Sequence, residues 1–249
     1  MGAFKNKYLR KHASLLHRRD DPPTGWLVSA TTSCETRALG QIRSFLDTLL
    51  FQLFPDAEPK WPEVIKELDV DESHLEEQDI VNNDDENSPK KQRYFQMVDA
   101  ASAGLLFVRF RCSVDPIDLW KALVKHIRQL DDSSRQSLLS KLSFCHRILP
   151  IEHVCSADST TITADLTRVL QTHDLSKAKT VAIVAECRNN PSLSTKKLIE
   201  AAATVLPTQL KVNLTKPDIV VFITVFKSCC GIAIYDDYYG LSKHNIHKI

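Results

Sequence analysis

The sequence predicts a mixed α/β (α+β) fold in which a ferredoxin-like unit precedes a second α/β unit. Three observations predict this class. Short apolar stretches typical of strands alternate with segments whose apolar residues recur at helical spacing. The stretch at residues 180–187 is apolar almost throughout, as in a strand buried on both faces. A proline-containing and then acidic segment at about 55–93 interrupts the first unit, and we expect it to be disordered.

The first unit is expected at residues 25–145, after a basic flexible arm at residues 1–24. Strands are predicted at residues 25–30 and 104–111, and Asp115-Pro116 is a favourable helix start. The helix expected at residues 34–53 has one apolar face, made of Leu39, Ile42, Phe45, Leu46, Leu49, Leu50 and Leu53.

The second unit is expected at residues 146–249. Residues 147–155 read as a strand that Pro150 makes an edge or bent strand. Ser159 or Thr160 can cap the helix that follows. The remaining predicted elements are strands at 180–187, 218–226 and 230–236, a helix at 195–206 and a short extended segment at 211–214.

Charge is segregated along the chain. Residues 67–86 hold ten acidic and no basic residues, so the rest of the chain carries a formal net charge of +11, whereas the whole chain carries +1. The first nineteen residues hold basic and no acidic side chains: Lys5, Lys7, Arg10, Lys11, Arg18 and Arg19. An acidic segment and a basic arm in one chain indicate a nucleic-acid binder with a solvated loop.

Cysteine and glycine usage excludes several classes of site. The seven cysteines include no C-x-x-C pair, which favours reduced, packed thiols, and neither His146 nor His153 has the ligand spacing of a zinc site. The six glycines form no G-x-G-x-x-G or phosphate-binding loop. No apolar run reaches the roughly 18 residues of a membrane span. We therefore predict no metal, no cofactor, no small-molecule substrate, no membrane association and no catalytic residue.

The junction of residues 186–207 is the strongest candidate for a binding site. An apolar strand ends in Arg188, Asn189 and Asn190, and the next helix opens with Lys196 and Lys197. Amides and cations at such a junction can contact a phosphate or a ribose. A solvated turn is the alternative, because Asn-Asn-Pro is also good turn chemistry.

Two motifs carry a resemblance to a known family. The stretch KVNLTKPDIVVFITVFKSCCGIAIYDDYYGLSKHNI, residues 211–246, resembles a THUMP domain, as does RNNPSLSTKKLIE at residues 188–200. Residues 25–50 resemble the ferredoxin-like half that accompanies THUMP, and residues 147–155 resemble the segment between the halves. The chain departs from the family pattern at Asn213, where the family has Asp, and at His153, where Gly is expected.

The chain is most similar to the stand-alone branch of the family, the adaptors for tRNA cytidine acetylation. This resemblance implies a non-catalytic protein whose partners are tRNA and an RNA cytidine acetyltransferase. Such adaptors promote formation of N4-acetylcytidine in the D arm of tRNA-Ser and tRNA-Leu. The resemblance also implies a location in the nucleus or nucleolus, with the cytoplasm as the alternative.

The RNA-binding residues that follow from the junction, the basic positions and the resemblance are Arg188, Asn189, Asn190, Lys196, Lys197, Lys211, Lys216 and Lys227. The three lysines from 211 onward are expected to extend one basic edge along the RNA backbone. Two other functions remain open. One is an RNA-modifying enzyme with an unrecognised active site, and the other is a protein-interaction scaffold.

Overall fold

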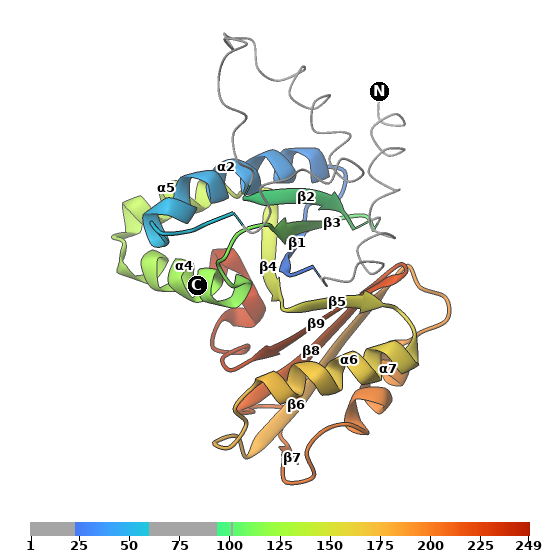
Figure 1. Cartoon of the computed structure of the whole chain (residues 1–249). Helices are drawn as coiled ribbons and strands as arrows, with labels where there is room; N and C mark the ends of the chain where they lie inside the picture. Colours follow the sequence, from blue (N-terminus) through green and yellow to red (C-terminus); the bar gives the residue numbers. More distant parts are fainter. Residues whose placement is uncertain (1–22, 60–93, 101) are drawn as a thin grey trace.

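The computed structural model describes residues 23–59, 94–100 and 102–249, and this part of the chain forms two sheets and five α-helices (Figure 1). The mixed α/β class is confirmed. Almost all of the predicted basic arm and most of the acidic segment lie outside the described residues. Within the described ranges, every α-helix is too short or too polar to cross a bilayer.

The first sheet has the order β2-β3-β1-β4, and all its neighbouring strands are antiparallel. Apart from α5, the strands and helices of this unit follow one another along the chain as in a ferredoxin-like unit. A ferredoxin-like unit stays our prediction for this part of the chain. The elements are β1 (Gly25–Ala30), α2 (Glu35–Leu53), β2 (Phe95–Asp99), β3 (Leu105–Phe110), α4 (Pro116–Gln129), α5 (Asp132–Ser140) and β4 (Cys145–Ile151).

Helices α2 and α4 follow the sequence pattern closely. The apolar face predicted for α2 is buried, except that Leu53 at its end is only partly so. In α4 the Asp115 carboxylate accepts hydrogen bonds from the backbone N–H groups of Ile117 and Asp118, and Pro116 occupies the first helical position. Sequence analysis missed α5, because this short helix buries no residue and so has no apolar stripe.

The second sheet has the order β5-β9-β8-β6-β7, in which β6 runs parallel to β7 and β8 while β9 runs antiparallel to β5 and β8. Asp158 caps α6, rather than Ser159 or Thr160. The elements are β5 (His153–Ser156), α6 (Ser159–Thr172), β6 (Thr180–Arg188), α7 (Thr195–Ala203), β7 (Lys211–Val212), β8 (Ile219–Phe226) and β9 (Cys229–Tyr235).

The strand predicted to be buried on both faces is β6, and this expectation is wrong for most of its length. Only Val181 and Ala182 of β6 are buried, because its outer neighbour β7 has two residues and leaves the remainder of β6 at the sheet edge. In the second sheet, the strands buried along their whole length are β8 and β9.

The stretch at residues 147–155 bends as predicted, and it divides between the two sheets. Strand β4 pairs with β1 at the edge of the first sheet, and after Glu152 the chain continues as β5, which pairs with β9. The boundary between the units therefore lies after Ile151, rather than after Cys145 as expected.

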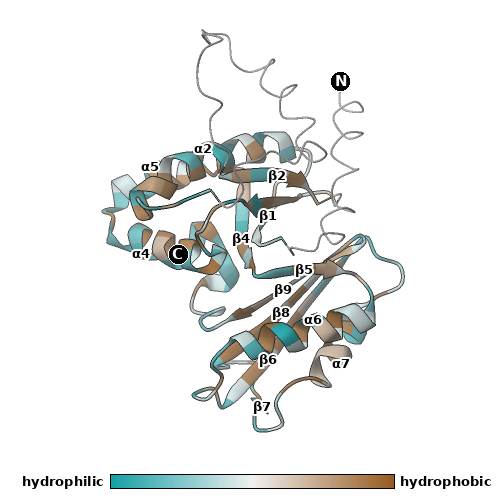
Figure 2. Ribbon diagram, in the orientation of Figure 1, coloured by the Kyte–Doolittle hydropathy of each residue, from teal (hydrophilic) through white to brown (hydrophobic). Residues whose placement is uncertain are grey.

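The two sheets pack against each other and form the middle layers of a four-layer molecule (Figure 1). Their shared core includes Phe107 of β3 and Phe226 of β8, whose rings stack with centroids 6.5 Å apart. Helices α2 and α4 cover the outer face of the first sheet, and α6 and α7 cover that of the second. Figure 2 shows the corresponding pattern, with apolar strands inside and polar helix surfaces outside.

The C-terminal segment returns to the first unit. Its short 3-10 helices, Ser242–His244 and Ile246–Lys248, follow β9, and Leu241 and Ile246 are buried in the core beneath α2 and α4. The end of the chain accordingly lies beside α4 (Figure 1). Because this segment spans both units, it contributes to holding them together.

Candidate nucleic-acid interface

The end of β6 is fixed by side-chain hydrogen bonds of Asn190. Its Oδ1 accepts from the backbone N–H groups of Ser192 and Leu193, both at 2.9 Å, and its Nδ2 donates to the Lys227 carbonyl at 2.7 Å. The turn interpretation of Asn-Asn-Pro is therefore confirmed for Asn190. The same bonds attach the turn after β6 to the hairpin between β8 and β9.

Asn189 connects this turn to the first unit. It adopts a left-handed backbone conformation (φ 54°), which Asn tolerates better than most residues. Its Nδ2 donates to Ser102 Oγ at 3.1 Å, in the segment that precedes β3. The end of β6 consequently lies at the joint between the two units.

The predicted cations at this end point away from the core. Arg188, Lys196, Lys197 and Lys227 are all exposed. Lys227 follows β8, and its N–H donates to the Arg188 carbonyl at 3.1 Å. In α7, capped by Ser194, Lys196 lies 3.8 Å from Glu200 and Lys197 Nζ donates to the Ser192 carbonyl at 3.1 Å. An ion pair as exposed as that of Lys196 with Glu200 contributes about 1 kcal/mol or less to stability. These cations therefore remain available to a polyanion.

We call these six residues, Arg188, Asn189, Asn190, Lys196, Lys197 and Lys227, the carboxyl edge, because they lie at the C-terminal ends of the parallel strands β6 and β8. Helix α6 begins beside them, since Ala157 N–H donates to the Ser228 carbonyl at 2.8 Å. The N-termini of α6 and α7 carry the positive ends of the helix dipoles, which add to the field of the four cations.

Lys211 and Lys216 lie at the opposite end of the sheet, which corrects the expectation of one continuous basic edge. Lys211 pairs with Thr180 at the start of β6, whereas Arg188 at its end pairs with Phe226. Nine residues of strand separate the two ends by about 25 Å at ~3.3 Å per residue. Lys216 lies in a turn that Asn213 closes by accepting from its backbone N–H. Because the Asn213 acceptor is a side-chain oxygen, the family's Asp can make the same bond.

Two clusters were not predicted from the sequence, because their members come from different helices and strands. Arg147 of β4 forms an ion pair with Glu186 of β6 at 2.7 Å, which joins the two units. His153 and Cys155 of β5 converge with Asp165 of α6. One sequence signal could have indicated the second cluster. His153 and Cys155 are two residues apart in a strand, and this spacing places both side chains on one face.

Residues 156–235, within the second unit, match the family model described as the THUMP domain. The chain is 26% identical over 171 residues to THUMP domain-containing protein 1 of Mus musculus, an alignment that covers 66% of this chain and 45% of that protein. It is also 26% identical over 165 residues to the Homo sapiens protein of the same name, covering 63% and 43% of the two chains.

A solved structure, PH1313 from Pyrococcus horikoshii, aligns with 85% of this chain and 54% of its own length, at 12% identity and a TM-score of 0.47. The chain spans less than half the length of the mouse and human proteins that it matches.

Proposed function

We propose that this chain is a non-catalytic adaptor that binds tRNA of the Ser or Leu type. It presents this tRNA to an RNA cytidine acetyltransferase, which forms N4-acetylcytidine in the D arm. The observation that carries the proposal is the carboxyl edge, in which four exposed cations gather on a THUMP domain at its joint with the first unit.

The chemistry of the carboxyl edge fits phosphate rather than base recognition. The Asn189 and Asn190 amides already bond within the protein, so the groups left to face a ligand are guanidinium and ammonium. Such groups contact the RNA backbone through charge and recognise its shape rather than its sequence. A protein that reads shape can hold a tRNA while another protein modifies a distant base.

A protein-interaction scaffold is the second candidate, and two exposed apolar side chains favour it. Val212 of β7 and Leu214 just beyond it are 73% and 68% exposed, at the edge of the second sheet. Apolar side chains beside an open sheet edge are typical of a protein contact. In the adaptor function, this edge would face the acetyltransferase while the carboxyl edge holds tRNA.

The enzyme alternative requires titratable groups that converge in a hollow. A hollow of about 360 Å³ beside α5 includes Asp132, Arg135 and His247. His247 Nε2 bonds to the Cys145 carbonyl. Arg135 pairs with Asp132 and donates to the carbonyls of Ile127 in α4 and Leu130 just after it. These contacts give the three side chains structural partners, which supports the non-catalytic assignment.

We place the adaptor in the nucleus or nucleolus, in keeping with its basic arm.

Reconstituted acetylation tests the adaptor role. We expect purified acetyltransferase, tRNA-Ser and acetyl donor to form N4-acetylcytidine much faster when this chain is added, as measured by mass spectrometry of nucleosides. Arg188→Ala/Lys227→Ala should reduce the stimulation roughly tenfold at limiting protein, because two phosphate contacts are lost.

Lys211→Ala/Lys216→Ala is the matched control, since it removes the same charge from the other end of the sheet and should reduce the stimulation less. No stimulation by the folded wild-type chain would contradict the adaptor role. Acetylated product formed by this chain without the acetyltransferase would establish the enzyme alternative.

A further inference from the structure

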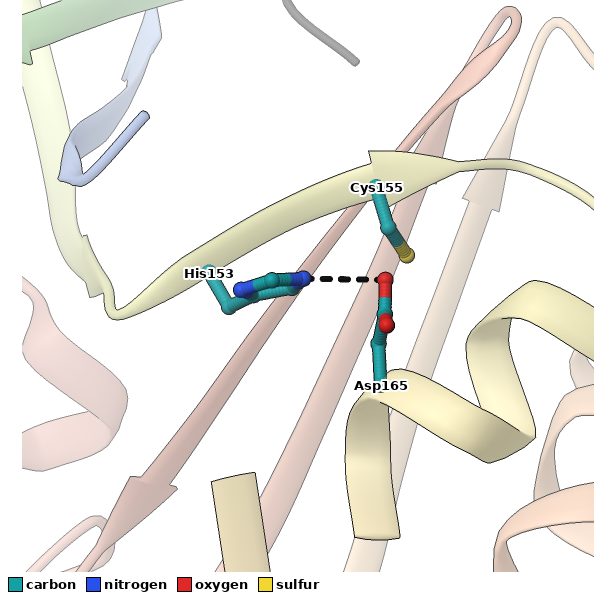
Figure 3. Close-up of side chains that lie close together, drawn as sticks. All are labelled: His153, Cys155 and Asp165. Atoms are coloured by element: carbon teal, nitrogen blue, oxygen red, sulfur yellow. Dashed lines mark hydrogen bonds and ion pairs between the residues drawn. The ribbon is translucent and has the colours of Figure 1, made fainter. Parts of the chain in front are cut away.

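Three side chains of different chemistry converge between β5 and α6. His153 and Cys155 project from one face of β5, and Asp165 projects toward them from α6 (Figure 3). One potential ligand atom from each residue lies within 4.8 Å of the other two. His153 Nε2 lies 2.9 Å from Asp165 Oδ2.

The cluster is buried. The side chains of His153 and Asp165 are 14% and 4% exposed, and Cys155 lies in the core of the second unit. Burial of a carboxylate is unfavourable unless charged or hydrogen-bonding partners compensate it. The partners of Asp165 are His153 and the guanidinium of Arg168, whose own side chain is 67% exposed.

The imidazole is placed to act as a ligand, because its Nε2 faces the Asp165 carboxylate at the centre of the cluster (Figure 3).

We propose that His153, Cys155 and Asp165 bind one divalent metal ion of the zinc class, which links β5 to α6. An imidazole nitrogen, a thiolate and a carboxylate form a ligand set that zinc accepts and that the oxygen-seeking calcium and magnesium ions do not prefer. Ligand atoms around a tetrahedral zinc ion lie about 3.3–3.8 Å apart, so side-chain shifts of about 1 Å or less bring this cluster to that geometry. The fourth position is left for water.

Three changes must accompany binding. The Cys155 thiol must release its proton to solvent, and the proton on His153 Nε2 must be replaced by one on Nδ1, so that Nε2 can coordinate. Arg168 must leave Asp165, because a guanidinium and a metal ion compete for the same carboxylate. Its exposed side chain can rotate into water without disturbing the core. A hydrogen-bonded His–Asp–Arg group without metal is the competing explanation.

Cobalt(II) titration of the full chain separates the two explanations, because this ion reports thiolate coordination by near-ultraviolet charge-transfer absorption. We expect one equivalent to give this absorption together with the visible bands of a tetrahedral site, and zinc to displace it. Cys155→Ala should abolish the charge-transfer band, and His153→Gln should weaken binding at least tenfold.

Arg168→Gln should bind more tightly than the wild type, because the competing cation is gone. A merely structural role of the cluster predicts no such gain. Cys34→Ala and His146→Gln are matched controls that should leave both the band and the affinity unchanged, since Cys34 and the exposed His146 lie in the first unit.

Circular dichroism is the control for the folding of each variant. If Cys155→Ala does not fold, the wild-type spectrum, His153→Gln and Arg168→Gln still decide the question. The proposal is overturned if folded wild-type protein gives no thiolate band, if the band persists in Cys155→Ala, or if Arg168→Gln weakens binding.

Discussion

The stability of the protein is expected to fall steeply as the pH drops below about 6.5, with His244 as the main cause. The side chain of this residue is buried among Trp120, Tyr235 and Tyr238, whose ring centroids lie 5.2, 4.4 and 5.6 Å from that of His244. Neither ring nitrogen has a hydrogen-bond partner in the described part of the chain. Burial, with a contribution from the nearby Arg147 cation, lowers the pKa of His244 to about 3.

The loss of stability in acid follows from proton binding by the folded and unfolded chains. Between pH 6.5 and 3 the unfolded chain protonates this imidazole while the folded chain does not, so acid favours unfolding. The loss is about 1.4 kcal/mol for each pH unit in this window. Chemical denaturation at a series of pH values measures it. A second buried histidine with a lowered pKa, His153, contributes in the same direction.

His244→Phe should raise the stability at pH 7 by about 1 kcal/mol, because it removes buried polar atoms that lack partners and keeps an aromatic ring in place. The variant should also lose most of the acid dependence. The exposed His146→Gln serves as the control and should behave as the wild type. An acid dependence that His244→Phe leaves unchanged would contradict this assignment.

Replacement of Arg147 by Met is expected to destabilise the protein by about 2–3 kcal/mol. The Arg147 guanidinium forms an ion pair with Glu186 at 2.7 Å and donates to Tyr238 Oη at 2.8 Å and to the Lys243 carbonyl at 2.9 Å. It therefore joins β4 of the first unit, β6 of the second and the C-terminal segment. The side chains of Arg147 and Glu186 are 22% and 24% exposed, so a lone Glu186 carboxylate would be poorly solvated.

Two further variants test whether the effect comes from this contact. Arg147→Met/Glu186→Met should recover part of the lost stability, because no carboxylate is left without its partner. Arg128→Met, on the exposed face of α4, should change stability by less than about 0.5 kcal/mol. Hydrogen exchange at residues 238–249 should accelerate in Arg147→Met alone. Unchanged exchange there would mean that Arg147 does not anchor the C-terminal segment.

Much of the fold follows from local sequence signals. The apolar stripe of α2 and the Asp115-Pro116 start of α4 each predicted an element that the structure contains, because amphipathic periodicity and capping act within a few residues. The pairing of strands was not predictable in the same way. Residues 147–155 read as one strand because nothing local shows that β4 and β5 join different sheets.

The candidate site was predicted only in part for a similar reason. Arg188, Asn189 and Asn190 are consecutive, and their place at a strand end was visible in the sequence. The separation of Lys211 from them depends on parallel pairing, which places the start of β7 beside the start of β6. Glu186, which pairs with Arg147, and Asp165, which pairs with His153, come from other elements and were not accessible to spacing arguments.

The central proposal is that the carboxyl edge binds tRNA near its acceptor end, as the resemblance to THUMP domains implies. The most direct test is the affinity of the full chain for tRNA-Ser with and without its 3′ end, measured at two salt concentrations. The account predicts binding that weakens with salt, weakens again when the 3′ end is removed, and falls roughly tenfold in Arg188→Ala/Lys227→Ala with the fold intact. Equal affinity for both tRNAs, or an unchanged dissociation constant in this folded variant, would contradict it.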